Sequence, residues 1–97
     1  MDHLENINKD IFYKLNDNIS YEFVEDGYII LNLNNGEYFE LNGSSSFIWD
    51  LISQQTSARL VIETIKKQYD ISEKETFDIL STIDKLEKLG LIKKIEN

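Results

Sequence analysis

Apolar and polar side chains alternate along residues 19–41, a pattern typical of strands that bury one face. The dipeptides Asp26-Gly27 and Asn35-Gly36 interrupt this alternation. Both favour two-residue hairpin turns, because both central residues of a type I′ turn need a positive φ. The pattern therefore predicts a three-stranded antiparallel meander with the strands Ile19–Val24, Tyr28–Leu33 and Glu37–Leu41.

Both faces of this meander would carry apolar side chains. With two-residue turns, one face would hold Phe23, Ile30, Phe39 and Leu41, and the other Val24, Ile29, Leu31, Leu33 and Tyr38. A bulged turn would change this register. One apolar face is enough to close a small core, so we expect the N-terminal segment or a partner to cover the second.

From residue 44 the apolar positions follow a helical period. One of the serines at positions 44–46 can cap a first helix that runs to about Ser53. Thr56 or Ser57 can cap a second helix that runs to about Tyr69. The inward side chains of the first helix would be Phe47, Ile48, Leu51 and Ile52.

The third helix has the clearest end signals. Ser72 and Glu75 have the spacing of a capping box, which satisfies two N–H groups at a helix start. Gly90 is a typical stop residue. These signals predict a helix from Glu73 to Leu89, and Leu91–Ile95 would add a short terminal extension.

Residues 1–18 are mostly polar, with one small apolar cluster at Ile11, Phe12 and Tyr13. We interpret this segment as a flexible arm whose apolar cluster can pack on one domain formed by residues 19–97. The predicted element order is βββααα, in the α+β class. Strands followed by three helices resemble a winged helix-turn-helix with its strands placed first.

The composition narrows the class of protein. Ninety-seven residues suffice for one domain, and the absence of cysteine excludes disulfides and thiolate metal sites. The net charge of −8 repels phosphate backbones and anionic membranes, and it favours neutral or basic partners. The N-terminus lacks a signal-peptide pattern, and no apolar run is long enough to span a membrane. We expect a cytoplasmic protein.

A winged-helix fold would allow a DNA-binding transcriptional regulator, whose third helix would enter the major groove. The third helix is net acidic, however, and carries no arginine. Its charged residues are Glu73, Glu75, Asp78, Asp84 and Glu87 against Lys74, Lys85 and Lys88. The regulator therefore stays an alternative function, and we expect no nucleic acid as partner.

Candidate catalytic residues are few. His3, the single histidine, falls in the predicted arm, and the serines 44–46 have no histidine near in sequence to activate them. Glu25-Asp26 lacks the further ligands of a calcium loop. We therefore predict no enzymatic activity, no metal and no cofactor. Trp49 lies off the main stripe of its helix, at the edge of the core, with ligand stacking as the alternative.

The order of several short motifs is similar to that of a known family. The chain has "LN" at 41–42 followed by small residues, "IWDL" at 48–51, "YD" at 69–70, "FDIL" at 77–80 and "LEKLGLI" at 86–92. Over residues 20–95 it resembles the PqqD-like proteins, peptide chaperones whose fold is also called the RiPP recognition element. One departure is "SQQT" at 53–56, where the family often has a glycine before the threonine.

This resemblance implies a binding activity. Such proteins hold the leader of a ribosomally made precursor peptide, which adds as a strand beside the third strand and lies against the third helix. Carried onto this sequence, the resemblance implies contacts from Glu37, Tyr38, Phe39, Glu40 and Leu41 on the strand and from Phe77, Leu80, Ser81, Asp84 and Lys85 on the helix. For Phe39, Phe77 and Leu80, ordinary core packing is the other interpretation.

The implied partners are the leader peptide and a separate maturation enzyme, such as a lasso leader peptidase or a radical SAM enzyme. The product class stays open at this point between a lasso peptide, a redox cofactor and a radical-modified peptide. A general protein-interaction module with an unrelated partner is a further alternative.

Overall fold

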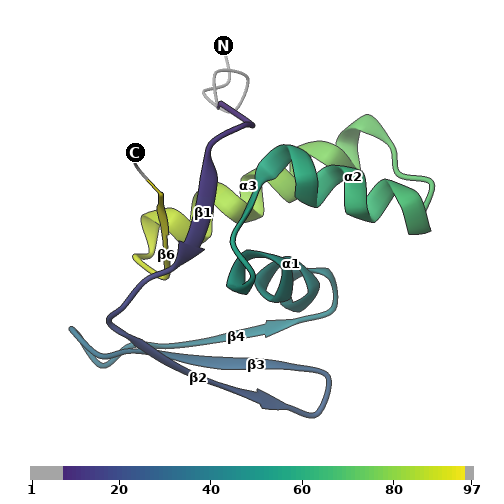
Figure 1. Cartoon of the computed structure of the whole chain (residues 1–97). Helices are drawn as coiled ribbons and strands as arrows, with labels where there is room; N and C mark the ends of the chain where they lie inside the picture. Colours follow the sequence, from purple (N-terminus) through teal and green to yellow (C-terminus); the bar gives the residue numbers. More distant parts are fainter. Residues whose placement is uncertain (1–7, 96–97) are drawn as a thin grey trace.

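The computed structural model describes residues 8–95, and Figure 1 shows their arrangement. In chain order the elements are β1 (Phe12–Leu15), β2 (Ile19–Val24), β3 (Gly27–Asn32), β4 (Tyr38–Asn42), α1 (Ser44–Ser53), β5 (Thr56–Ser57), α2 (Ala58–Gln68), α3 (Glu73–Lys88) and β6 (Ile92–Lys94). The predicted α+β class with three helices is confirmed. His3 lies outside the described residues.

The predicted meander is present as an antiparallel sheet in the order β2-β3-β4. Its turns differ from the predicted ones. Val24 pairs with Gly27, so Glu25 and Asp26 are the central residues of the first turn, and Glu25 takes the positive φ of 53°. The second connection is a longer loop, in which the Asn32 N–H donates to the Glu37 carbonyl at 2.9 Å.

Both turns shift the predicted pairing by two residues. A shift of two residues keeps every side chain on its face, whereas a shift of one would reverse the faces. The inner face, which includes the fully buried Ile30, therefore has the predicted members. We call the opposite surface the outer face and define it by the side chains of Glu22, Val24, Ile29, Leu31, Tyr38 and Glu40.

The core lies between the inner face and the helices. Helix α1 contributes Ile48, Trp49 and Ile52, none of them more than 1% exposed. Trp49 packs edge-on against Tyr21, with ring centroids 5.6 Å apart, so it is a core residue. Figure 1 shows the three helices and the second sheet on the α1 side, so no described element covers the outer face.

The second sheet corrects the interpretation of the arm. Phe12–Leu15 form β1, which pairs with β5 on one side and with β6 on the other. Tyr13 is only 2% exposed, because its side chain belongs to the core. The arm's apolar cluster thus packs on the domain through a regular strand, and the terminal extension forms the strand β6.

The helix ends follow the sequence signals with one exception. The Ser57 side chain accepts from the Leu60 N–H at 3.2 Å, and Ser72 with Glu75 completes the capping box. Helix α1, however, begins after Gly43 with no side-chain cap, and Ser44 already belongs to the helix. Gln55 has a φ of 63°, at the place where the family often has glycine. Glycine is the residue that adopts such a φ at least cost.

Candidate functional site

Strand β4 is an edge of the meander, since β3 is its single neighbour in the sheet. In an antiparallel ladder, successive residues direct their N–H and C=O groups alternately toward and away from the partner strand. Glu37 accepts from Asn32 of β3. By this alternation Phe39 and Leu41 also bond to β3, and the backbone groups of Tyr38 and Glu40 point away from the sheet.

The predicted strand residues therefore divide into two groups. Phe39 and Leu41 lie half-buried on the inner face and pack against the core, as the core interpretation of Phe39 expects. Tyr38, which is 71% exposed, and Glu40 lie on the outer face. The Glu37 carboxylate accepts from the Asn35 side chain at 2.7 Å and belongs to the loop before β4.

Helix α3 runs beside β4 in the opposite direction. At its N-terminal end, Glu75 and Asp78 line a hollow together with Ser44, which begins α1 just after β4. At its C-terminal end, Gly90 lies near Asn32, the residue that pairs with Glu37 before β4 begins. Both ends of β4 therefore lie near α3, and we call the space between the open edge of β4 and α3 the groove. The residues that line its hollows come from the helices and the segments beside them, and none comes from β4.

The hollow in this groove has a volume of about 220 Å³. Its floor is apolar, because Ile48, Ile65 and Ile79 are buried there. It is continuous with a second hollow of about 530 Å³, since both share Ser44, Ile65, Ile71 and Glu75. Carboxylates stand at the rim, in Glu75 and Asp78, and Glu75 is held by its capping bonds to Ser72. The groove thus combines an apolar floor with an acidic rim.

The predicted helix residues lie elsewhere on α3. None of Phe77, Leu80, Ser81, Asp84 and Lys85 lines the two hollows. Leu80 is 6% exposed and packs in the core, and Phe77 is 42% exposed. Ser81 and Lys85 are exposed as well.

Asp84 shows why the α3 residues that line the groove differ from the five predicted helix contacts, which we call the predicted wall. The pKa of Tyr13 in β1 is raised by burial and by the carboxylates of Glu87 and Asp84, so these carboxylates lie toward β1. Asp84 also pairs with Lys88 at 3.1 Å. Thr82, which lines the groove, is two residues away, and two residues turn a helix by about 200°. The two stripes therefore lie on nearly opposite sides of α3.

Ile79 and Thr82 are not among the helix contacts that the resemblance implies. Their stripe with Glu75 and Asp78 has the same helical spacing as the predicted wall. A sequence pattern marks the buried stripe of a helix but does not say which of its flanks faces a given strand. The placement depends on how α3 packs against α1.

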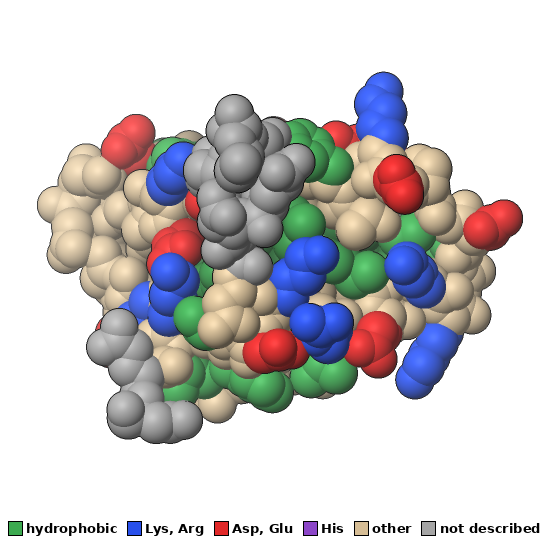
Figure 2. All heavy atoms as spheres, turned by 90° about the horizontal axis from the view of Figure 1, so that it is seen from above, with side chains coloured by type: hydrophobic (Ala, Val, Ile, Leu, Met, Phe, Trp, Pro, Cys, Tyr) green, Lys and Arg blue, Asp and Glu red, His purple; other side chains and the backbone are tan. Residues whose placement is uncertain are grey.

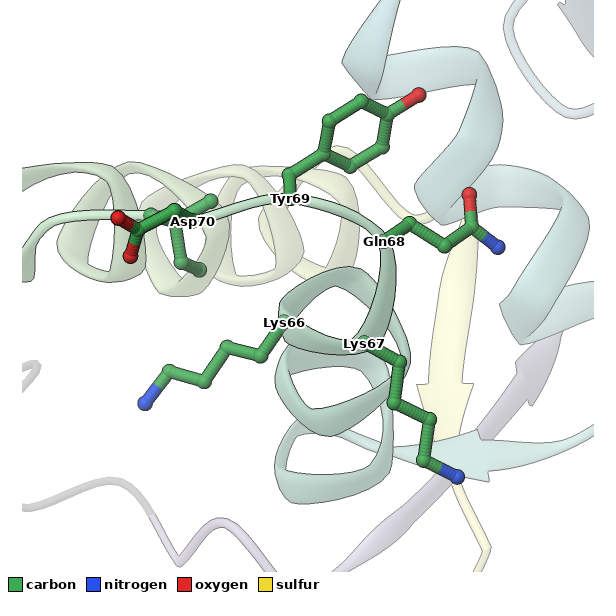
Figure 3. A pocket seen from close by; sticks show the side chains of 6 residues that line it. Lys66, Lys67, Gln68, Tyr69 and Asp70 are labelled. Atoms are coloured by element: carbon green, nitrogen blue, oxygen red, sulfur yellow. The ribbon is translucent and has the colours of Figure 1, made fainter.

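Another hollow, of about 570 Å³, lies at the end of α2 and the turn that follows it. Figure 3 shows Lys66 and Lys67 pointing away from the Tyr69 ring, so the side chains do not converge on one point. Among residues 8–95 no cluster of His, Asp or Glu could hold a metal ion. None of the described helices has the length and hydropathy to span a membrane.

One known family and two solved structures are similar to this chain over most of its length. The family model described as coenzyme PQQ synthesis protein D (PqqD) matches residues 27–92. Among solved structures, one described as TbiB1 in complex with the TbiA(beta) leader peptide has a TM-score of 0.76 and 21% identity, covering 87% of this chain and 99% of that chain. One described as lasso peptide synthetase B1 complexed with the leader peptide has a TM-score of 0.73 and 22% identity, covering 84% and 96%. No curated protein matches the chain.

Proposed function

The chain belongs to the PqqD family, and we propose that it binds the leader region of a ribosomally made precursor peptide and presents the peptide to a separate maturation enzyme. The open edge of β4 beside an apolar hollow is the observation that carries this proposal. The two similar structures, both described as leader-peptide complexes, support it. The proposed role is binding without catalysis and without a cofactor.

The leader would bind as an additional strand along β4. Its backbone would hydrogen-bond to the outward N–H and C=O groups of Tyr38 and Glu40, and each such bond contributes about 0.5 to 1.5 kcal/mol. Phe39 and Leu41 would then support the added strand from the inner face. Alternate side chains of the leader would point toward the groove between β4 and α3.

The hollow between α1 and α3 would hold an apolar side chain of the leader. Its volume of about 220 Å³ is enough for one large side chain, and its isoleucine floor offers no hydrogen-bond partner to a polar one. Burial of such a side chain contributes roughly 1.5 to 3 kcal/mol. We therefore assign the helix contacts to Glu75, Asp78, Ile79 and Thr82 in place of the wall that the resemblance implies.

Charge would select among leaders with similar anchors. Asp78 and Glu75 stand at the rim of the hollow, Glu40 lies on the outer face of the neighbouring strand β4, and the chain's net charge is −8. A leader with a lysine or arginine beside its apolar anchor fits this arrangement. Rim charges of this kind contribute about 1 kcal/mol or less and weaken with salt, so the apolar anchor dominates the affinity.

Titration of the fluorescently labelled leader of the precursor peptide tests the proposal in buffer with a chelator. We expect binding without metal or nucleotide. Thr82→Phe should fill the hollow and weaken binding about 10-fold or more, because the loss of a buried anchor exceeds 1.4 kcal/mol. Ser81→Phe is the matched control: it adds the same ring to an exposed neighbour on α3 and should change the affinity less than about 2-fold.

The two phenylalanine variants show which side of α3 contacts the leader. If Ser81→Phe weakened binding as much as Thr82→Phe, the wall implied by the resemblance would take part and the hollow would not be the anchor site. If the leader failed to bind at all, peptide binding at this groove would be excluded.

A further inference from the structure

Charge is divided very unevenly along this chain. Every lysine and arginine lies outside the segment 15–58, which contains β2, β3, β4 and α1. Figure 2, seen from above the helices, shows lysine and arginine side chains spread over that side of the molecule. The same segment holds seven carboxylates, namely Asp17, Glu22, Glu25, Asp26, Glu37, Glu40 and Asp50. The meander and its helix therefore carry nearly the whole net charge of −8, and the rest of the chain is close to neutral.

The outer face of this acidic half is also apolar. A solvated sheet face normally carries polar side chains. Here Val24, Ile29 and Leu31 occupy neighbouring outward positions on β2 and β3, and Tyr38 extends the apolar surface onto β4. Figure 1 shows no helix or strand of residues 8–95 on this side of the sheet, and Val24, Ile29 and Leu31 are half-buried by their neighbours within it. Such an uncovered patch is typical of a binding surface.

The carboxylates stand within this surface. Ile29 pairs with Glu22 on one side and with Glu40 on the other, so one cross-strand row reads Glu-Ile-Glu. At the turn, a hollow of about 350 Å³ is lined by Val24, Ile29 and three carboxylate residues, Glu25, Asp26 and Glu40, among others. Gly27 also lines this hollow, and it lies so close to β4 that a Cβ there would be 2.0 Å from the Leu41 carbonyl oxygen, a clash that only glycine avoids.

We propose that the outer face is the docking surface for the maturation enzyme, and that the enzyme contributes an apolar patch bordered by lysine or arginine. This inference rests on the proposed function. The stem of a long basic side chain fits against Val24 and Ile29 while its charge lies among the carboxylates of the hollow. A second copy of this chain fits poorly, because it would bring the same carboxylates together with no cation between them.

The position of the surface suits transfer of the peptide. A leader bound along β4 would become the next strand of the sheet, and half of its side chains would point to the same side as Ile29. An enzyme on the outer face would then touch the protein and its cargo at once. Two weak contacts on one rigid surface strengthen each other by effective concentration.

The test uses the purified enzyme that acts on the same precursor and measures its affinity for the immobilised full chain. Glu22→Lys should weaken this binding about 5-fold at low salt and less at high salt, as a rim charge does. Ile29→Thr keeps a β-branched strand residue and should weaken it about 5-fold at both salt concentrations. Glu63→Lys makes the same charge change on α2, in the other half of the molecule, and should change the affinity less than about 2-fold.

Leader affinity is measured in parallel for all three variants and should stay unchanged. A protein that does not bind the leader would contradict the proposed function. A protein that binds the leader normally, yet loses no enzyme affinity in Glu22→Lys and Ile29→Thr, would overturn the docking surface alone. The docking surface would also be overturned if Ile29→Thr converted a dimer of this chain to monomers, or weakened the leader complex without enzyme present.

Discussion

The two sheets of this molecule are built in opposite ways. The meander β2-β3-β4 joins consecutive strands through short turns, and it leaves the edge of β4 and a whole face open. The sheet β5-β1-β6 joins three short segments from the beginning, the middle and the end of the chain, and it buries Tyr13 in the core. We call the meander the open sheet, because it carries the proposed binding surfaces. We call β5-β1-β6 the closed sheet, because it joins distant parts of the chain and packs on the core.

Several contacts at the ends of β1 reinforce the closed sheet. The Asn16 N–H donates to the Leu91 carbonyl at 3.0 Å, and the Ile95 N–H donates to the Phe12 carbonyl at 2.8 Å. Arg59 pairs with Asp10 at 2.6 Å, which holds the pKa of that carboxyl below its usual value. Substitutions in the closed sheet should therefore affect stability, and substitutions on the open edge should affect binding.

Among the variants that test this comparison, Tyr13→Ala should have the largest effect, and the effect should be on stability. The side chain is buried, and removal of a large aromatic residue from a core costs about 3 kcal/mol or more of unfolding free energy. Phe12→Ala is the matched control, because Phe12 is the neighbouring residue of β1 and is 42% exposed. It should cost about 1 kcal/mol or less.

Urea denaturation followed by circular dichroism measures both variants. At low temperature, where Tyr13→Ala is still folded, its leader affinity should equal that of the unchanged protein. Equal destabilisation by the two alanine variants would mean that β1 does not anchor the core through Tyr13.

The same contrast explains what the sequence could predict. The strands of the meander were predictable because their turns and alternation lie within about 25 residues of one another. The pairing of β1 with β5 and β6 joins residues as far apart as Tyr13 and Lys94, and each of these strands has only two to four residues. Segments that short carry no periodicity of their own. Tertiary packing decides their structure.

Glu40→Pro should have the second-largest effect, and it acts on the open edge. The Glu40 N–H points away from β3, so proline there removes a hydrogen-bond donor to the leader but none within the sheet. We expect leader binding to weaken about 10-fold, because a leader carbonyl left without a partner costs 1 to 3 kcal/mol. Glu40→Ala keeps the N–H and should weaken binding less than about 3-fold.

Hydrogen exchange gives an independent measure of the same edge. On addition of leader, the amides of Tyr38 and Glu40 should gain more protection than those of Phe39 and Leu41, which already bond to β3. Similar gains along β2, the other edge of the sheet, would argue against addition of the leader at β4.

The sequence predicts which residues of β4 lie on each face of the sheet, but it does not predict which side of α3 lies beside the open edge. The meander pattern fixes the residues of β4 and their faces, and a register shift of two residues leaves those faces unchanged. The helix contacts depend on the rotation of α3 about its axis. Ile79 and Thr82 border the groove, and Asp84 lies toward Tyr13, although all three are close in sequence.

The smallest expected effect concerns the pKa of one tyrosine from each sheet. In the closed sheet, burial is the main cause that raises the pKa of Tyr13. In the open sheet, the Tyr28 hydroxyl donates to the Asp50 carboxylate of α1, and this bond is the main cause that raises the pKa of Tyr28 to about 12. The Tyr28 bond ties the inner face to α1 beside the buried Trp49.

The sign of the pH effect follows from the raised pKa. An unfolded tyrosine ionises near pH 10, so the Tyr28 contribution to stability is complete below pH 10 and is lost as the pH rises from 10 to about 12. Tyr28→Phe removes this dependence. The difference in urea midpoint between the two proteins should therefore shrink between about pH 8 and pH 11, by the equivalent of about 1 kcal/mol or less, because the bond is only part-buried.

Asp50→Asn tests whether the Asp50 carboxylate or burial raises the pKa of Tyr28. The amide oxygen can still accept from the Tyr28 hydroxyl, but the negative charge that opposes phenolate formation is gone. Phenolate absorbance should then show one tyrosine titrating at lower pH than in the unchanged protein, with Tyr13 unaffected. If Asp50→Asn left the titration unchanged, burial alone would raise both tyrosines, and the open sheet would be joined to α1 by apolar packing, as the closed sheet is joined to the core.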